Sequence, residues 1–350
     1  MKILFLAPYP PGESPSQRYR FEQYLSLLEK AGIPYDYKSF LGEGTWRVFF
    51  KPGFFLKKTT GLLAGFARRW WLMVQIGRYS HVYIHREAAP MGPPVYEWII
   101  RRVWGKKLIY DYDDAIWIPS VSGYNKIARH FKWFSKVRSI CRMADTVSAG
   151  NEFLAGFAKP YCKNVVIMPT VVDTEGRHNI LQHQEVAKPA VGWTGTFSTL
   201  KYLDMVLPSL QHLQEKIDFT FIVIANKDPQ LKLKNYRFIP WNRESEISDL
   251  LTFHIGLMPL HDGALEKGKC GFKAIQYMAL GIPALVSPVG VNDRIVENGV
   301  NGYLCNSRTE WEERITELLQ NNQLRATLGQ NARRKICMEY SVHSTCEKFL

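Results

Sequence analysis

The chain has 350 residues, of which 46% are hydrophobic and 22% are charged, and its formal net charge is +13. A chain of this length usually forms more than one core, so two domains of about 150–200 residues are expected. The apolar content excludes a largely disordered chain. The basic excess predicts a partner with negative charge, such as a phosphorylated substrate, an anionic membrane or nucleic acid.

Six cysteines are spread along the chain without the close spacing of zinc ligands or of a disulfide framework. Reduced thiols in the cytoplasm fit this pattern better. The apolar stretch after Met1 is too short for a signal peptide, and no stretch reaches the roughly 18–20 apolar residues that span a bilayer. We therefore expect a cytoplasmic protein.

The first half of the chain alternates apolar runs with helical patterns. Helices are predicted at 21–31 and 95–103, and strands at 3–7, 81–85, 107–112, 144–148 and 165–168. Strands separated by helices favour parallel pairing in βαβ units. Residues 1–172 are therefore interpreted as a Rossmann-like domain.

The second half repeats this scheme after a polar stretch, 173–189, which is interpreted as a linker. The predicted strands are 190–193, 219–225, 237–240, 255–259 and 283–287, and the predicted helices are 202–214, 244–251, 272–280 and 309–319. The second domain is placed at 190–337, and a last helix at about 338–350 is expected to return to the first domain. The fold class is α/β, with two doubly wound parallel sheets facing across a cleft that binds ligands at the carboxyl ends of the strands.

The segment 268–283, GKCGFKAIQYMALGIP, carries the strongest functional signal. Backbone N–H groups around Gly271 and Phe272, where a loop enters a helix, favour an anion. Lys273 in the first turn opposes the helix dipole unless an anion shares the site, and a diphosphate satisfies both. Gln276 falls on the same helix face, within reach of a ribose hydroxyl. The alternative is an ordinary amphipathic helix packed on a sheet.

This segment resembles the nucleotide-binding helix of family 4 retaining glycosyltransferases, the "glycosyl transferases group 1", which have two Rossmann-like domains in the GT-B arrangement. Their usual motif is Glu-x7-Glu before an Ala-Met-Ala-type turn and Gly-x-Pro. Here Gln276 occupies the place of the second acid and Gly268 that of the first, with Glu266 nearby. The resemblance implies that Lys273 and Gln276 bind the donor. It also implies transfer with retention and without a metal.

A second stretch, 191–196 (VGWTGT), predicts a strand that ends in a turn of small residues. In the family this loop holds the donor diphosphate. The resemblance therefore makes Thr194, Gly195, Thr196 and Lys201 candidates for donor binding. A plain strand–helix turn is the alternative.

The loop after the first strand, PYPPGESPSQRYR, contains Gly12, Arg18 and Arg20. In the family this loop approaches the donor phosphates, so Gly12 is expected there. Arg18 is assigned to the acceptor side. Exposed ion pairs are the alternative for both arginines, and are favoured for Arg20.

Strand 81–85 ends at His85, and the turn that follows resembles the turn in which the family's histidine meets the transferred sugar. His85 and Lys273 are therefore the candidate catalytic residues. A structural histidine at a strand end is the alternative.

The run YDYDDAIW contains Asp111, Asp113 and Asp114. An Asp-x-Asp pair can hold a metal that carries a nucleotide diphosphate, as in glycosyltransferases with a single Rossmann domain. We favour an acceptor-side role for Asp113 and Asp114 and no metal, because the second domain has its own diphosphate signature.

Between Glu43 and Glu87 the sequence has no acidic residue, whereas basic and aromatic residues are interleaved there. Four apolar residues recur at helical spacing: Leu62, Phe66, Trp70 and Met73. This combination is typical of a helix that lies on an anionic membrane. Packing of the stripe against the sheet is the alternative. No pattern of a nucleic-acid-binding motif supports nucleic acid as the partner.

The sequence therefore predicts a metal-independent glycosyltransferase with a nucleotide-diphosphate sugar as substrate and no other cofactor. The expected acceptor is a glycan or a lipid-linked molecule in cell-surface polysaccharide or glycolipid synthesis, with peripheral contact to the inner face of the plasma membrane. Two alternatives stay open because a fold does not fix a function. They are a nucleotide-sugar epimerase and a non-catalytic glycan- or membrane-binding relative.

Overall fold

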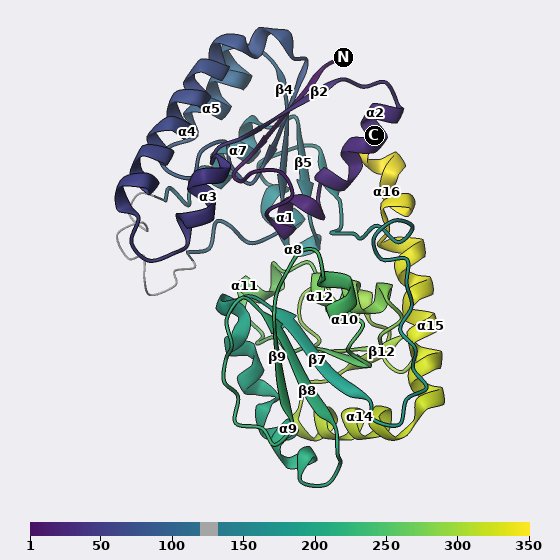
Figure 1. Cartoon of the computed structure of the whole chain (residues 1–350). Helices are drawn as coiled ribbons and strands as arrows, with labels where there is room; N and C mark the ends of the chain where they lie inside the picture. The colour runs from purple at the N-terminus through teal and green to yellow at the C-terminus, as the bar shows by residue number, and fades with distance from the viewer. Residues whose placement is uncertain (120–131) are drawn as a thin grey trace. The chain divides into compact units, whose positions relative to one another are not determined.

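The computed structural model describes residues 1–119 and 132–350 of the chain (Figure 1). The chain divides into two compact units, Met1–Thr170 with Cys346–Leu350, and Val171–Thr345. The first unit contains both chain ends because the last helix, α16 (Val342–Phe349), belongs to it with its final residues.

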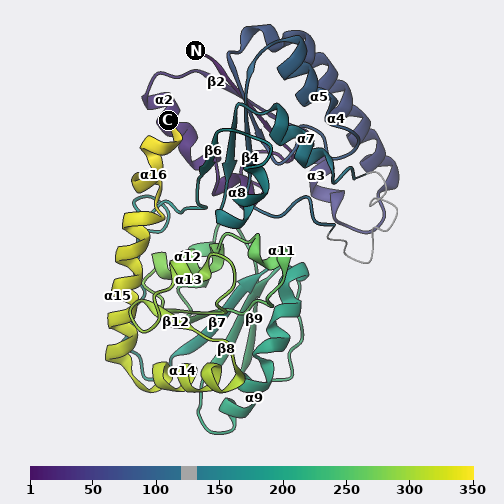
Figure 2. The ribbon, with the colours of Figure 1, turned by 180° about the vertical axis from the view of Figure 1, so that it is seen from behind.

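The first unit is built on six parallel strands in the order β2-β1-β3-β4-β5-β6 (Figure 2). The strands are β1 (Ile3–Ala7), β2 (Tyr35–Ser39), β3 (His81–His85), β4 (Lys107–Tyr112), β5 (Thr146–Ala149) and β6 (Val165–Ile167). The connecting helices are α1 (Pro15–Arg18), η1 (Glu22–Tyr24), α2 (Leu25–Lys30), α3 (Glu43–Phe49), α4 (Phe55–Gln75), η2 (Ile76–Arg78), α5 (Val95–Trp98), the π-helical η3 (Ile99–Val103), α7 (Lys136–Met143) and α8 (Glu152–Ala158).

Aromatic rings fill one face of this sheet. Phe5 of β1 stacks on Phe21 with ring centroids 5.4 Å apart, and Tyr83 of β3 lies 5.0 Å from Phe5. Phe349 of α16 stacks on Tyr24 at 4.3 Å. The end of the chain is thus part of the hydrophobic core of the first unit.

The second unit also has six parallel strands, in the order β12-β11-β10-β7-β8-β9. They are β7 (Ala190–Gly195), β8 (Thr220–Ala225), β9 (Tyr236–Pro240), β10 (Ile255–Met258), β11 (Ala284–Val286) and β12 (Gly302–Leu304). The helices are η4 (Phe197–Met205), α9 (Leu207–Gln214), α10 (Glu246–Leu250), α11 (Ala264–Lys267), α12 (Phe272–Ala279), α13 (Asn292–Ile295), α14 (Arg308–Gln320) and α15 (Asn322–Glu339).

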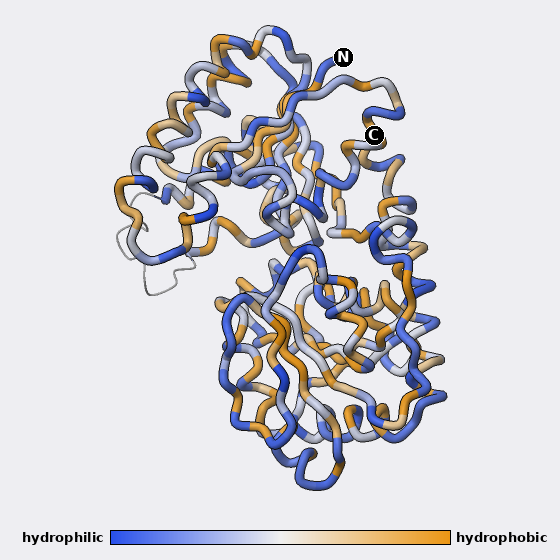
Figure 3. Tube along the Cα trace, viewed as in Figure 1, coloured by the Kyte–Doolittle hydropathy of each residue, from blue (hydrophilic) through white to orange (hydrophobic). Residues whose placement is uncertain are grey.

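Strands β8 and β10 of the second unit are mostly apolar (Figure 3). Such strands are buried on both faces, as expected of a parallel sheet covered by helices. Helix α12 packs closely on them, because Gly256 of β10 leaves the space that the Tyr277 ring fills: a Cβ there would lie 2.3 Å from that ring.

The predicted α/β fold with two parallel sheets is confirmed. The sequence did not predict β2 or β12, and both are edge strands. β2 reads YDYKS and is only half-buried, and β12 is three residues long, so neither has the apolar run of a central strand. The predicted helix 202–214 is two elements, because Pro208 begins a new helix, α9, after the 3-10 turns of η4.

The ends of the predicted domains also differ in detail. The segment 173–189, interpreted as a linker, lies within the second unit. Its residue Gln184 is buried and donates to the Gly281 carbonyl at 3.1 Å, so the segment is packed against the unit. The predicted helix at 338–350 is the end of α15 followed by α16.

Two helical glycines of the first unit give a matched test of how α4 packs. A Cβ at Gly65 of α4 would lie 2.7 Å from the Phe40 ring, whereas a Cβ at Gly156 of α8 would meet nothing within 4 Å. We expect Gly65→Ala to lower the free energy of unfolding by about 1–3 kcal/mol through overpacking. Gly156→Ala should raise it by about 0.5–1 kcal/mol through helix propensity. Urea denaturation measures both, and equal effects would contradict close packing of α4.

Candidate functional site

Three neighbouring strands bring polar side chains into one row in the first unit. His85 of β3 lies opposite Asp111 of β4, and Asp111 lies opposite Ser148 of β5. Residues that are paired across neighbouring strands point to the same face of a sheet. The register of the sheet therefore builds this row.

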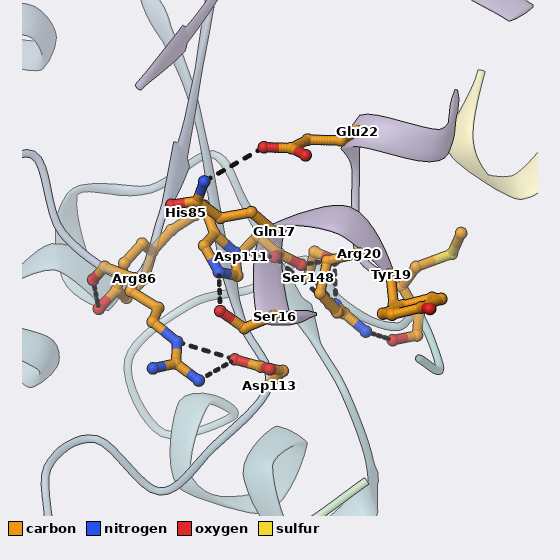
Figure 4. Close-up of polar contacts among 12 residues, drawn as sticks. Ser16, Gln17, Tyr19, Arg20, Glu22, His85, Arg86, Asp111, Asp113 and Ser148 are labelled. Carbon is orange, nitrogen blue, oxygen red and sulfur yellow. Dashed lines mark hydrogen bonds and ion pairs between the residues drawn. The ribbon is translucent and has the colours of Figure 1, made fainter. Parts of the chain in front are cut away.

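The Asp111 carboxylate is the centre of the row (Figure 4). Its Oδ1 accepts hydrogen bonds from the Ser148 hydroxyl at 2.7 Å and from the Arg20 guanidinium, and its Oδ2 accepts from His85 Nδ1 at 2.7 Å. The side chains of Arg20, His85 and Asp111 have no exposed surface. Burial alone would raise the pKa of Asp111, but Arg20 and His85 hold that pKa far below its ordinary value. Asp111 is therefore ionised.

This ionised carboxylate fixes the tautomer of His85. Asp111 has no proton to give, so Nδ1 of His85 is the donor in their hydrogen bond. The other ring nitrogen, Nε2, lies 3.4 Å from the hydroxyl of Ser16 on α1. Ser16 is therefore the residue of α1 that Nε2 of His85 meets.

Arg86 follows His85 in a strained backbone conformation, with φ of 62°. Its guanidinium donates to Asp113 Oδ1 from Nε at 2.9 Å and from Nη2 at 2.7 Å. Burial tends to raise the pKa of Asp113, and the charge of Arg86 lowers it below the ordinary value. Asp114 accepts from the Ala115 amide at 3.0 Å, a turn contact. Left-handed backbone at a non-glycine residue costs about 1–3 kcal/mol and is concentrated at functional sites.

The loop after β1 is tied down by its own residues. The Gly12 amide, expected near donor phosphates, donates to Glu22 Oε2 at 2.8 Å. Arg18 is buried and donates to the Tyr19 hydroxyl at 2.9 Å. The exposed ion pair favoured for Arg20 is wrong, because its guanidinium is buried on Asp111.

A pocket of about 40 Å³ opens beside Arg86. Its lining includes Tyr9, Arg86, Glu87, Trp133 and Lys136. Lys136 Nζ lies 2.7 Å from Glu87 Oε2, so these two charges of the lining are paired. Aromatic rings beside polar groups suit a polar ligand such as a sugar.

In the second unit, helix α12 begins where the sequence predicts it. Its N-cap Gly271 has φ of 66°, and a Cβ there would lie 2.1 Å from Ile295 Cδ1, so only glycine fits. Lys273 in the first turn lies over the Trp193 ring of β7, with Nζ 4.3 Å from the ring centroid. Burial and the neighbouring Lys269 lower the pKa of Lys273 to about 7.

Two further N–H groups accompany this lysine without a hydrogen-bond acceptor among the described residues. They are the amide Nε2 of Gln276, whose side chain belongs to a 3% exposed residue, and the indole Nε1 of the fully buried Trp193. A buried donor that is left unsatisfied costs about 1–3 kcal/mol. A ligand that accepts hydrogen bonds would recover this cost.

The turn after β7 is occupied by internal contacts. The Thr194 amide, a candidate phosphate donor, instead donates to the Tyr277 hydroxyl at 2.9 Å. A Cβ at Gly195 would lie 2.4 Å from the Trp193 ring, so Gly195 makes room for that ring. The Thr196 amide donates to Thr199 Oγ1 at 3.1 Å.

Lys201 stands in different surroundings from Lys273. Its Nζ lies 3.8 Å from Oε1 of Glu266 on α11, and Glu266 also accepts from the Tyr202 hydroxyl. Glu266 is buried, whereas the Lys201 side chain is 57% exposed. Glu266, which lies two residues before the position of the first acid in the family motif, is thus held beside Lys201, a predicted diphosphate-binding residue.

Several residues of these sites were not predicted. Ser148 lies opposite Asp111 in the neighbouring strand, and Arg86 directly follows His85. The register of the sheet would therefore have indicated both. Ser16 and Trp193 gave no signal of their own in the sequence. Within residues 1–119 and 132–350, no group of three His, Cys, Asp or Glu side chains is arranged to hold a metal ion. Freedom from metal stays a prediction.

Comparisons with known proteins agree on the family. Residues 182–335 match the family model "Glycosyl transferases group 1". An uncharacterised glycosyltransferase of Methanocaldococcus jannaschii, MJ1178, is 29% identical over 155 residues, which are 40% of this chain and 41% of that protein. The family resemblance inferred from the sequence is therefore confirmed, and it is carried by the second unit.

Solved structures agree on the fold. Sucrose-phosphate synthase of Thermosynechococcus elongatus has a TM-score of 0.71 at 13% identity, covering 100% of this chain and 97% of that chain. Anabaena HepE in complex with UDP and glucose has a TM-score of 0.66 at 17% identity, covering 100% and 98%. At these identities the likeness shows the GT-B fold.

Replacing Asp111 tests the buried network. Asp111→Asn leaves Arg20 buried without a counter-charge, so the free energy of unfolding at neutral pH should fall by about 3–5 kcal/mol. The folded pKa of Asp111 is depressed, so its contribution is present above the unfolded pKa of about 3.9 and is lost as pH falls below that value. The difference in the free energy of unfolding between the wild type and Asp111→Asn should therefore become smaller at acidic pH.

The matched control is Asp114→Asn, because an asparagine oxygen can still accept from the Ala115 amide. Its effect should stay within about 0.5 kcal/mol. Urea titrations of both variants across pH measure the difference. If the loss of unfolding free energy in Asp111→Asn did not change with pH, Asp111 would not be the ionised centre of this network.

Proposed function

We propose that this protein, whose second unit carries a glycosyl transferases group 1 domain, transfers a sugar from a nucleoside diphosphate to a glycan or lipid-linked acceptor. The observation that carries the proposal is the donor cluster of α12 and β7. Lys273 lies in the first turn of α12 over the Trp193 ring, and Gln276 follows in the second turn. Together they supply one ammonium and two N–H groups that lack an acceptor among the described residues. Such a set suits a pyrophosphate and the hydroxyl oxygens of a nucleotide.

In this proposal the donor cluster stabilises the leaving group, which is the nucleoside diphosphate. When the bond between the sugar and the diphosphate breaks, negative charge grows on the phosphate oxygens. A fixed ammonium and fixed N–H donors in a water-poor site stabilise that charge without reorganising. We assign Lys273 and the first turn of α12 to the phosphates and Gln276 to the ribose.

Lys201 with Thr194, Gly195 and Thr196 forms the second part of the donor site in this proposal. The Thr194 and Thr196 amides are bonded internally, and the Thr196 hydroxyl lies 2.9 Å from the Ser198 hydroxyl. The Thr194 hydroxyl and the exposed ammonium of Lys201 are therefore the groups proposed to meet the ligand. Glu266 beside Lys201 is positioned to keep that ammonium in place.

The first unit supplies the acceptor side in this proposal. His85 is buried, so the atom proposed to act is Nε2, which faces Ser16 and would reach a sugar hydroxyl once that serine side chain rotates. Asp113 holds Arg86 at the rim of the pocket that contains Tyr9, and Arg18 and Gly12 belong to the loop beside it. We propose retention of configuration and independence from metal, as the family resemblance implies, and a cytoplasmic setting, as the pattern of cysteines favours.

An epimerase on the same fold would interconvert a nucleotide sugar in the absence of acceptor. A non-catalytic relative would bind nucleotides but turn over no donor. Thermal shift against a panel of nucleoside diphosphates, followed by donor turnover with and without acceptors, separates these outcomes. Since HepE was solved with UDP-glucose, that compound is the first donor to test.

Replacing Lys273 tests the donor site. We expect Lys273→Ala to weaken the binding of UDP-glucose about 10–100-fold, because a charge-assisted hydrogen bond is lost. Lys267→Ala is the control, since this lysine ends α11 just before the same loop but its Nζ pairs with Asp262 at 2.9 Å. Calorimetric titration measures both. Equal affinities in the two variants would refute the role of Lys273.

The depressed pKa of Lys273 adds a pH dependence. In the free protein Lys273 loses its proton as pH rises through about 7. A bound diphosphate favours the charged form, so affinity for UDP-glucose should fall by up to about tenfold per pH unit above that point. In Lys273→Arg the guanidinium stays charged, and the slope should disappear. Parallel slopes in the two proteins would contradict this assignment.

Two amide substitutions separate the ring nitrogens of His85. In His85→Asn the side-chain amide can still donate to Asp111 in place of Nδ1, but nothing replaces Nε2. Turnover of UDP-glucose should fall about 100-fold while affinity changes little. His85→Gln, whose amide reaches the Nε2 position, should retain more activity. Unchanged turnover in His85→Asn would leave His85 with a structural role only.

A further inference from the structure

The long helix α4 carries apolar residues on two opposite sides. Its inner side contains the buried Leu72 and Met73 and the half-buried Leu62 and Phe66. The sequence indicated a stripe of Leu62, Phe66, Trp70 and Met73, and most of that stripe faces inward. Trp70 is the exception, since 53% of it is exposed.

A second stripe, here called the outer stripe, follows the solvent side of the same helix. Leu56, Leu63, Trp70 and Val74 are 80%, 63%, 53% and 68% exposed, and Trp71 beside them is 68% exposed. Their spacing of seven, seven and four residues keeps them on one line along a helix of 3.6 residues per turn. The positions between them on this side, Thr60 and Ala67, carry no charge.

A stripe of this kind is unusual on a soluble surface. Single exposed apolar residues are common, but a contiguous row along a helix of 21 residues marks a contact with an apolar phase or partner. Helix α5 lies beside α4 (Figure 1), and Trp98 there is 51% exposed. Figure 3 shows apolar residues recurring along α4.

The charges near the outer stripe indicate that its partner is anionic. Between Glu43 and Glu87 no acidic residue occurs. Of the basic residues there, Arg69 is buried and donates to the carbonyls of Ala88, Ala7 and Lys38, so it is structural. Lys51 and Lys57 are exposed on the turn after α3 and at the start of α4. Arg47 is exposed on α3, where it lies 3.8 Å from the exposed Glu43 carboxylate. The surface that carries the outer stripe is therefore positive.

We propose that the outer stripe of α4 inserts into the interface of an anionic lipid bilayer, with Arg47, Lys51 and Lys57 bound to lipid headgroups. The helix would lie in the plane of the interface, with Trp70 and Trp71 at the depth of the headgroups, where indole rings are favoured. No helix of residues 1–119 and 132–350 is long and apolar enough to cross a membrane. The proposed contact lies at the surface of the bilayer, and it does not depend on the proposed sugar transfer.

Vesicle co-sedimentation of the full chain tests the proposal. Vesicles of phosphatidylcholine with phosphatidylglycerol should bind the protein, and vesicles of phosphatidylcholine alone should bind it at least about 10-fold more weakly. Replacing Leu63, Trp71 and Val74 together by Gln should lower the partition coefficient by about 10-fold or more. Lys51→Gln and Lys57→Gln should each lower it about 5-fold, and added salt should lower it as well.

The matched control replaces three exposed apolar residues of the second unit by Gln. Ile180, Val300 and Met338 of the second unit are 54%, 48% and 67% exposed, and their joint replacement by Gln should leave vesicle binding unchanged. Circular dichroism and thermal melting check that both triple variants are folded. Quenching of tryptophan fluorescence by brominated lipids should be strong in the wild type and weaker when Trp71 is replaced.

Three outcomes would overturn the proposal. Binding to anionic vesicles that the Gln variant of the outer stripe retains in full would mean that charge alone is responsible. Absence of binding with a concentration-dependent dimer, lost in that same variant, would assign the stripe to a second copy of the chain. Absence of both would leave the stripe without either partner.

Discussion

The buried carboxylate of Asp111 is the interaction on which the first unit depends. Three strands and the loop before Phe21 meet there, because Asp111 accepts from Ser148, His85 and Arg20 at once. A buried charge of this kind is tolerated only when it is fully paired. The pairing in turn fixes the ring of His85 and its tautomer, so a structural requirement of the fold also orients a group that the proposed chemistry uses.

The second unit uses the opposite strategy. Around Lys273 the buried polar groups are donors that lack acceptors among the described residues, namely Gln276 Nε2 and Trp193 Nε1. The lysine lies on an aromatic face, which attracts a cation weakly and does not occupy its hydrogen bonds. Buried donors without acceptors lower the stability of the folded unit. In the proposed function, an anionic ligand would supply these acceptors. This contrast is why the two units are assigned different roles.

Sequence patterns predicted the buried strands and missed two of the four edge strands, β2 and β12. Central strands such as β3 and β4 have apolar runs that match their observed bounds, whereas β2 looks like a loop because its side chains meet water. Site residues that are close in sequence, such as Lys273 and Gln276, could be found from one helix. Trp193 could not, because its contact with Lys273 exists only when β7 packs beside α12. Arg20 and Asp111 are 91 positions apart, and only the sheet brings them together.

The net charge shows how far composition alone can be taken. Arg20, Arg69 and Arg325 are among the largest fully buried side chains, so part of the basic excess is internal. Arg69 and Arg325 are bonded to backbone carbonyls, and burial lowers the pKa of Arg69 to about 10 while leaving it charged at neutral pH. Formal charge therefore overstates what a partner meets. The exposed lysines and the arginine around the outer stripe of α4 are a smaller number of charges, but they stand beside apolar residues that are each more than half exposed. It is this combination that distinguishes a lipid interface from a generally basic surface.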